Sequence, residues 1–139
     1  MKKLLLILSV ITAIVSCQSL TQKEETGPNG VFKIPLGETI IRGGVSITFS
    51  EILEDSRCPS EVTCVWAGKA KVRVLLSMPG DETKEVVVVF EKGKQTNIAS
   101  KKDCVFTAME LVPYPAKAGK NEFMYELLVA KKCRVVEEN

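Results

Sequence analysis

Five cysteines are the residues of this 139-residue chain whose type and spacing could do chemistry, because the sequence contains no His. His is the commonest general base and transition-metal ligand, so its absence removes the usual catalytic and metal-binding arrangements. After the first Cys, the others form two pairs with five and 28 intervening residues, whereas structural zinc sites usually contain Cys-x2-Cys knuckles. We therefore expect neither a zinc site nor a redox-active dithiol. The cysteines are Cys17, Cys58, Cys64, Cys104 and Cys133.

A catalytic Ser or Cys would need an activating base other than His. That base would have to be Lys, and no Ser-x-x-Lys pattern is found on a predicted helix. Asp and Glu number 17, but none of them falls in a recognisable acid–base motif. The sequence therefore favours a non-enzymatic protein without a metal or other cofactor.

The most distinctive stretch consists of DSRCP at residues 55–59 and CVWAG at residues 64–68. Trp66 is the only Trp, and we expect it to pack against a cystine, as the buried Trp of immunoglobulin domains does. Pro59 would stiffen this loop. In the alternative interpretation the loop is a rigid contact surface, with Arg57 and Trp66 as binding anchors.

Other residues of the same stretch, and Arg57 itself, have predicted structural roles. Asp55 and Ser56 can cap loop amides, and Arg57 can pair with Asp55 or with backbone carbonyls. Gly68 is expected to adopt a turn geometry that other residues avoid. A second candidate contact is Tyr114, which lies between two prolines in residues 112–117 and could equally cap the end of a sandwich.

The DSRCP…CVWAG stretch resembles a segment of a family of small, secreted, largely uncharacterised bacterial proteins. In that family a similar segment lies between two strands, and the resemblance covers about residues 31–133. It implies a β fold and an exported location. It supplies no activity and no catalytic residue.

The N-terminus has the pattern of an export signal. Two lysines precede an apolar stretch at residues 4–15, which is too short to span a bilayer and fits a signal-peptide core. Residues 14–17, IVSC, resemble the lipobox of bacterial lipoproteins. The resemblance implies cleavage after residue 16 and a lipid-modified Cys17. The residues that follow are polar and show no apolar period, so we expect residues 17–30 to form the lipidated Cys and a flexible tether.

Export places the other four cysteines in an oxidising compartment, where they are expected to form two disulfides. Three pairings are possible. Cys58 and Cys64 are near neighbours in a turn-rich loop, and Cys104 and Cys133 lie at the outer ends of the last two predicted strands. If those strands are antiparallel, their ends meet, which favours Cys58–Cys64 together with Cys104–Cys133.

The elements that must position these residues alternate between apolar and polar side chains with a period of two. Residues 69–78 alternate clearly, residues 45–53 are expected to contain a bulge, and residues 84–90 include four consecutive valines that suggest a central or covered strand. We predict one domain at residues 31–139, an all-β antiparallel β-sandwich of about seven strands, immunoglobulin-like in form. A small closed β-barrel is the alternative. The other predicted strands are residues 31–34, 38–41, 104–112 and 123–133.

The charge of the chain narrows the class of partner. The formal net charge is +2, and removal of residues 1–16 would leave 17 basic and 17 acidic side chains. A neutral domain is a poor match for nucleic acid. We predict a lipoprotein of the bacterial cell envelope, held at the outer membrane on its periplasmic face or at the cell surface. It would bind a protein, a peptide or an envelope polymer, in the manner of an inhibitor or as a structural accessory of an envelope complex.

Overall fold

The computed structural model describes residues 30–115 and 124–134. The predicted signal peptide, the lipobox with Cys17, and all but the last residue of the predicted tether lie outside these residues. Within the described ranges no helix is long and apolar enough to cross a membrane.

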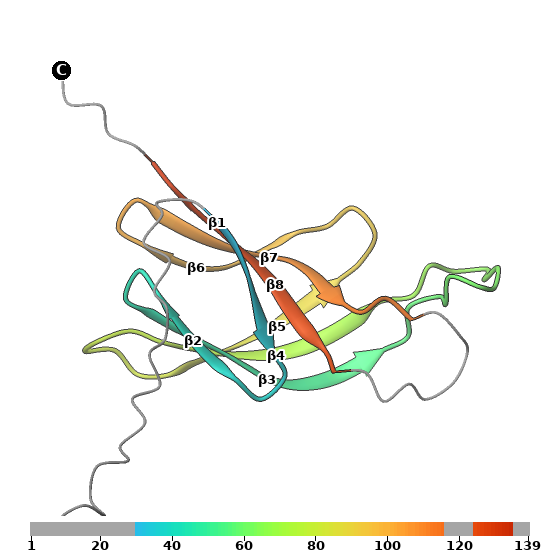
Figure 1. Cartoon of the computed structure of the whole chain (residues 1–139), viewed down its shortest axis with the longest axis horizontal. Coiled ribbons are helices and arrows are strands. Elements are labelled where there is room, and N and C mark those ends of the chain that lie inside the picture. The colour runs from blue at the N-terminus through green and yellow to red at the C-terminus, as the bar shows by residue number, and fades with distance from the viewer. Residues whose placement is uncertain (1–29, 116–123, 135–139) are drawn as a thin grey trace, which may run out of the picture.

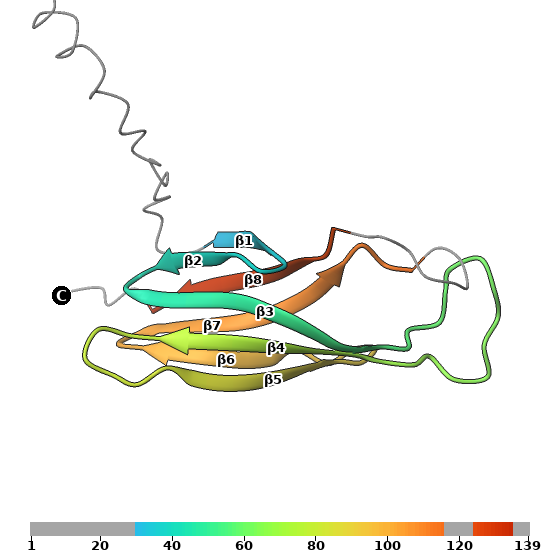
Figure 2. The same ribbon diagram turned by 90° about the horizontal axis from the view of Figure 1, so that it is seen from below.

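The described residues form eight β-strands in two antiparallel four-stranded sheets that face one another (Figures 1 and 2). One sheet has the strand order β1-β8-β7-β6, and the other has the order β2-β3-β4-β5. The strands are β1 (Gly30–Pro35), β2 (Thr39–Arg42), β3 (Val45–Asp55), β4 (Ala70–Ser77), β5 (Lys84–Phe90), β6 (Thr96–Lys101), β7 (Cys104–Val112) and β8 (Glu126–Cys133).

The sandwich is confirmed, and the two sheets do not close into a barrel. The order of strands differs from the immunoglobulin-like form that we expected. Immunoglobulin constant domains place strands A, B, E and D in one sheet and C, F and G in the other. Here β2 to β5 form one continuous meander and β6 to β8 another, with β1 added beside β8. Strands that follow one another in the sequence are therefore neighbours within each meander, and the chain changes sheets after β1 and after β5.

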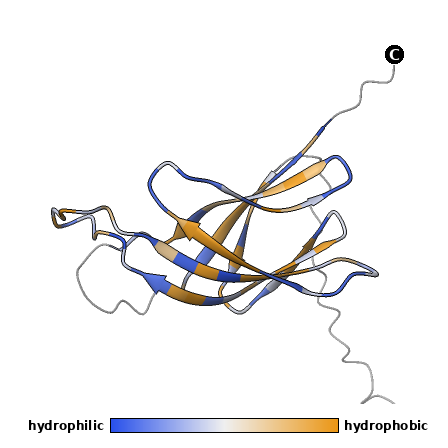
Figure 3. Ribbon diagram, turned by 180° about the vertical axis from the view of Figure 1, so that it is seen from behind, coloured by the Kyte–Doolittle hydropathy of each residue, from blue (hydrophilic) through white to orange (hydrophobic). Residues whose placement is uncertain are grey.

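Alternation along the strands creates the core between the sheets. In β4 every second residue is buried, beginning with Ala70, as its sequence pattern predicts. Phe49 of β3 and Phe106 of β7 are fully buried in the same hydrophobic core. Figure 3 shows the resulting concentration of apolar residues along the strands and of polar residues in most turns. Burial of these side chains, at roughly 25 cal/mol per Å² of apolar surface, is the main force that holds the two sheets together.

Three strands test finer predictions. The expected bulge in β3 is present, because its register with β4 shifts between Phe49 and Glu51. Residues 84–90, predicted to be central or covered by a neighbour, form β5, which is an edge strand of its sheet and leaves Val87 exposed. The sequence pattern missed β6, in which Ile98 is the single buried residue.

The disulfide between Cys104 and Cys133 joins the start of β7 to the end of β8, as predicted. These two residues are direct cross-strand partners. Just beyond the pair, the backbone N–H of Arg134 donates to the carbonyl of Asp103 at 2.9 Å. The ring closed by this disulfide is long enough to contribute ~3.6 kcal/mol on the loop-entropy model.

Candidate functional site

The connection between β3 and β4, residues 56–69, is the longest projection of the described chain and is here called the disulfide loop (Figures 1 and 2). It extends away from one end of the sandwich, beyond the strands that carry it. The disulfide Cys58–Cys64 closes a small ring within it, as the sequence predicted. On the loop-entropy model a ring of this size contributes ~2.4 kcal/mol.

Backbone hydrogen bonds hold the two arms of the disulfide loop together at its base. The N–H of Ser56 donates to the carbonyl of Lys69 at 2.8 Å, and that of Cys58 donates to the carbonyl of Ala67 at 3.0 Å. The pairing of β3 with β4 therefore continues into the loop in a ladder-like form. The disulfide adds a covalent link above these bonds, so the projection leaves the sandwich on a stiff stem.

Arg57 anchors the base of the loop to the other sheet. Its side chain is 8% exposed and makes a bidentate ion pair with Asp55, with both N···O distances 2.8 Å. The same guanidinium donates to the carbonyls of Leu111 at 2.6 Å and Pro113 at 3.0 Å. The predicted pairing with Asp55 and with backbone carbonyls is thus confirmed. Because Arg57 is buried, it cannot be the exposed binding anchor of the alternative interpretation.

Asp55 is held in its charged form by the groups around it. Burial acts to raise the pKa of its carboxyl, but hydrogen bonds from Arg57 and Tyr125, with the charge of Arg57, outweigh that effect and lower the pKa. The Tyr125 hydroxyl donates to Asp55 Oδ2 at 2.9 Å, and burial together with this hydrogen bond raises the pKa of Tyr125. The cluster therefore contains one cation, one anion and one neutral phenol, an arrangement suited to fixing structure.

Tyr114 completes the cluster from its outer side. The guanidinium of Arg57 lies 5.0 Å from the centre of its ring, which is within cation–π distance. Tyr114 remains 47% exposed, so one side of its ring is available to a partner. Its neighbour Pro115 accepts a 3.0 Å hydrogen bond from the N–H of Ser60 in the disulfide loop. Pro59 is half-buried beside this contact, so residues 113–115 and the disulfide loop form one joined surface.

Gly68 lets the second arm of the loop pass close to the first. Its φ is +68°, a conformation that L side chains rarely adopt. A Cβ added here would lie 1.8 Å from the carbonyl oxygen of Ser56, well inside contact distance. The predicted need for Gly at this position is confirmed, and its cause is steric as well as conformational.

Three apolar side chains of the disulfide loop are exposed, contrary to the predicted packing of Trp66 against the cystine. Trp66 is 81% exposed and Val65 is 90% exposed. Val62, on the other side of the ring, is also exposed. The ring is short and lies outside the sandwich, so Trp66 has no core within reach. These three residues are called the loop tip below.

A hollow of about 880 Å³ lies beside the disulfide loop, between its base, β7 and the turn that follows β5. Apolar and charged groups share its wall, and the ion pair between Lys94 and Glu91 lies at the turn. No three Cys, Asp or Glu side chains of the described ranges lie together in a group that could hold a metal. The hollow is lined in part by Pro59, Val62, Met109 and Tyr114.

No protein-family model, curated protein or solved structure matches the chain. The resemblances of the lipobox and of the DSRCP…CVWAG segment therefore stay predictions. The candidate site rests on geometry, which brings Pro59 and Tyr114 to the wall of the hollow, packs the buried Arg57 against Tyr114, and leaves Trp66 exposed on the disulfide loop.

Sequence reasoning missed Val62 and Val65 as members of this surface. A signal for them was present, because both lie within or next to a small closed ring together with the polar residues Ser60, Glu61 and Thr63. A ring of that size has almost no interior, so its apolar side chains must point to solvent or to a partner.

Proposed function

We propose that the protein is a non-catalytic binding module of the bacterial cell envelope, exported and held at the membrane by a lipid on Cys17. The loop tip would be its main contact with a protein partner. The observation that carries the proposal is the exposure of Trp66 and Val65 on a projection stiffened by a disulfide and a buried Arg.

A protein partner suits this surface better than an envelope polymer does. A large aromatic side chain flanked by aliphatic ones gains binding free energy when a hydrophobic pocket covers it, and Trp is among the commonest hot-spot residues. The stem and the ring already fix the backbone, so little conformational entropy is lost on binding. A rigid projecting loop of this kind fits a cleft, as inhibitor loops do, and this supports the inhibitor-like form of the proposal.

The test uses the full-length protein with a photo-crosslinking amino acid placed at Val65, which is 90% exposed next to Trp66, and separately at Ile41 as the control. Ile41 is 55% exposed on β2, away from the disulfide loop, and so gives a matched apolar site. We expect a discrete crosslinked partner from position 65 in intact envelopes and none of the same mass from position 41. With the probe kept at position 65, capture of that partner should fall at least about tenfold when Trp66→Ala is added.

Equal crosslinking from both positions, or undiminished capture by Trp66→Ala, would overturn the proposed use of the loop tip. The melting temperature of each variant must match that of the wild type, since this separates loss of binding from loss of folding. A partner that is recovered in fixed stoichiometry but does not depend on Trp66 would instead support the structural-accessory alternative.

A further inference from the structure

β5 is the least protected of the four edge strands in the described part of the chain. Edge strands expose unpaired N–H and C=O groups, and proteins usually shield them by short length, Pro, bulges or charge. β2 has four residues, β1 ends at Pro35, and β6 shifts register between Asn97 and Ala99. β5 has seven residues, contains no Pro, and keeps an unbroken register with β4.

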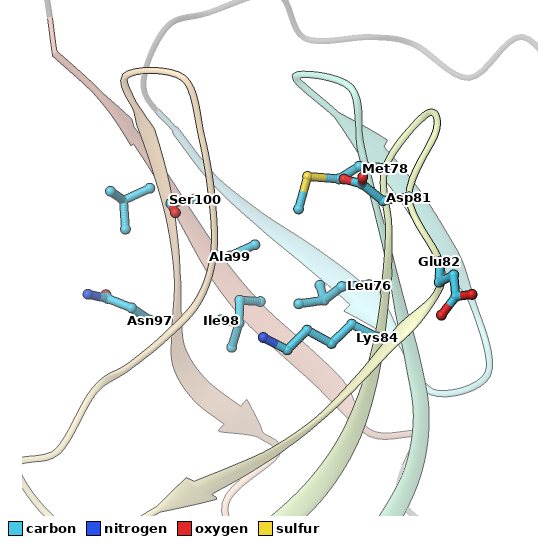
Figure 4. Close-up of a pocket in the computed structure, with 10 residues that line it drawn as sticks. Leu76, Met78, Asp81, Glu82, Lys84, Asn97, Ile98, Ala99 and Ser100 are labelled. Carbon is cyan, nitrogen blue, oxygen red and sulfur yellow. The ribbon is translucent and has the colours of Figure 1, made fainter.

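The side chains of β5 add an apolar surface to this free edge. Its middle is the run of four valines at residues 86–89, and Val87 on the outer face of the sheet is 47% exposed. The side of the sandwich next to β5 is also open. A groove of about 590 Å³ lies there, lined in part by Leu76, Met78 and Ile98 from both sheets (Figure 4). Lys84, at the start of β5, is the cation that lines the groove.

The length of β5 and its one acidic residue distinguish among the registers in which it could pair with itself. In an antiparallel pair related by a two-fold axis, partner residues point to the same face, so a single residue lies opposite itself at the centre. A centre at Glu85 places this Glu opposite its own copy, and like charges directly opposite one another are unfavourable. A centre at residue 86 pairs only residues 84–88 of the strand.

Centres further along the strand also pair fewer residues, with one exception. A centre at residue 88 pairs only residues 86–90, and a centre at residue 89 pairs only residues 88–90. Val87 is the midpoint of Lys84–Phe90, so a centre there pairs all seven residues of β5, places valines at the middle and sets Glu85 opposite Val89.

We propose that β5 pairs antiparallel with β5 of a second copy of this chain, centred on Val87. The pairing would join two four-stranded sheets into one continuous sheet and cover the outer edge of β5. It would also bring the second copy against the open side of the sandwich, where the groove lies. The inference is independent of the loop tip, because β5 and the disulfide loop use different surfaces.

Cysteine crosslinking of the full-length protein tests the register directly. Directly opposed residues of an antiparallel pair have Cα atoms about 4.5–5.5 Å apart, which a disulfide can bridge. Val87→Cys should form a dimer on mild oxidation, at about ten times the wild-type yield. The wild type, which contains Cys17, sets the background. Glu85→Cys and Val89→Cys should each give only background alone but crosslink when mixed, because these positions oppose one another.

A Val87→Cys yield at background overturns the proposal, and so does self-crosslinking of Glu85→Cys as strong as that of Val87→Cys. A charge at the centre of the pair gives a second measurement that needs no oxidation. Val87→Lys sets two Lys opposite one another and should raise the dimer dissociation constant about tenfold in sedimentation experiments, and an equimolar mixture with Val87→Glu should restore it. Wild-type protein that stays monomeric in sedimentation would also overturn the proposal. An extended strand of another protein would then be the alternative partner for the edge of β5.

Discussion

The base and the tip of the disulfide loop differ in the burial of their largest side chains. At the base, a charged Arg is buried among carbonyls and a carboxylate, and at the tip, a Trp lies in solvent. The usual preferences are the reverse, since Arg is mostly exposed and Trp is mostly buried. The comparison shows that the base is held by polar bonds to the sandwich, whereas the tip is left free for contact.

Breaking the buried ion pair should have the largest effect on the base. Arg57→Met leaves the Asp55 carboxylate buried without its cation, and we expect the free energy of unfolding to fall by ~3–5 kcal/mol. Denaturant unfolding gives the value. The matched control is Arg42→Met on β2. The Arg42 guanidinium lies 5.7 Å from the Phe32 ring and makes no ion pair within the described residues. We expect this control to lower the free energy of unfolding by ~1 kcal/mol or less. Equal costs for the two variants would show that the base does not depend on Arg57.

A methyl group at Gly68 should have the next largest effect. Gly68→Ala must move the carbonyl of Ser56 and also adopt a positive φ, so we expect a loss of ~2–4 kcal/mol. Gly80→Ala is the control, because its φ is +87° but nothing lies within 4 Å of the added Cβ. The control should lose only the strain energy of ~1–2 kcal/mol. A difference near zero between the two melting curves would mean that the two arms of the loop can separate easily.

The charge state of Asp55 should make the base sensitive to acid. The pKa of Asp55 in the folded protein lies below its ordinary value of 3.8, so its carboxylate stabilises the fold fully above that pH. This contribution is lost as the pH falls below about 4 and through the lowered pKa. Glu54 and Glu91 also have lowered pKa values, through hydrogen bonds with Lys71 and Lys94 respectively. Asp55→Asn should therefore flatten the pH dependence of unfolding in this window, and an unchanged slope would assign it to the two Glu residues.

The smallest effect on stability is expected at the tip. Trp66→Ala removes a side chain that is 81% exposed, so the free energy of unfolding should change by less than ~0.5 kcal/mol. Thermal unfolding followed by circular dichroism measures this without relying on the fluorescence of the lost Trp. A loss of several kcal/mol would place Trp66 against the sandwich and remove the contrast between base and tip.

Alternation along the chain was enough to predict the elements with a clear buried face. β4 follows a strict period of two, and the loop-forming residues before it mark its start. β6 was missed because it buries Ile98 alone and pairs with β7 largely through its backbone, which leaves no apolar pattern. The position of β5 at an edge depends on which strands are neighbours, and four valines in a row cannot specify that.

At the candidate site, local chemistry was predictable and burial was not. The pairing of Arg57 with Asp55 and the need for Gly68 involve only residues of DSRCP and CVWAG, whereas the carbonyls that Arg57 binds at Leu111 and Pro113 belong to a distant part of the sequence. Whether a side chain is covered depends on how far the loop extends from the core, a property of the assembled sandwich. The predicted packing of Trp66 was therefore wrong, whereas the predicted pairing of Arg57 was confirmed.

The stem of the disulfide loop has a consequence for how this surface can change over evolutionary time. Its two arms are joined by backbone hydrogen bonds, which depend little on the identity of the side chains between them. Residues 59–63, 65 and 66 could therefore accumulate substitutions, or be replaced by grafting, while the sandwich beneath keeps its sequence. A family built on this plan would diversify its recognition at one loop and conserve Arg57, Gly68 and the cystine that carry it.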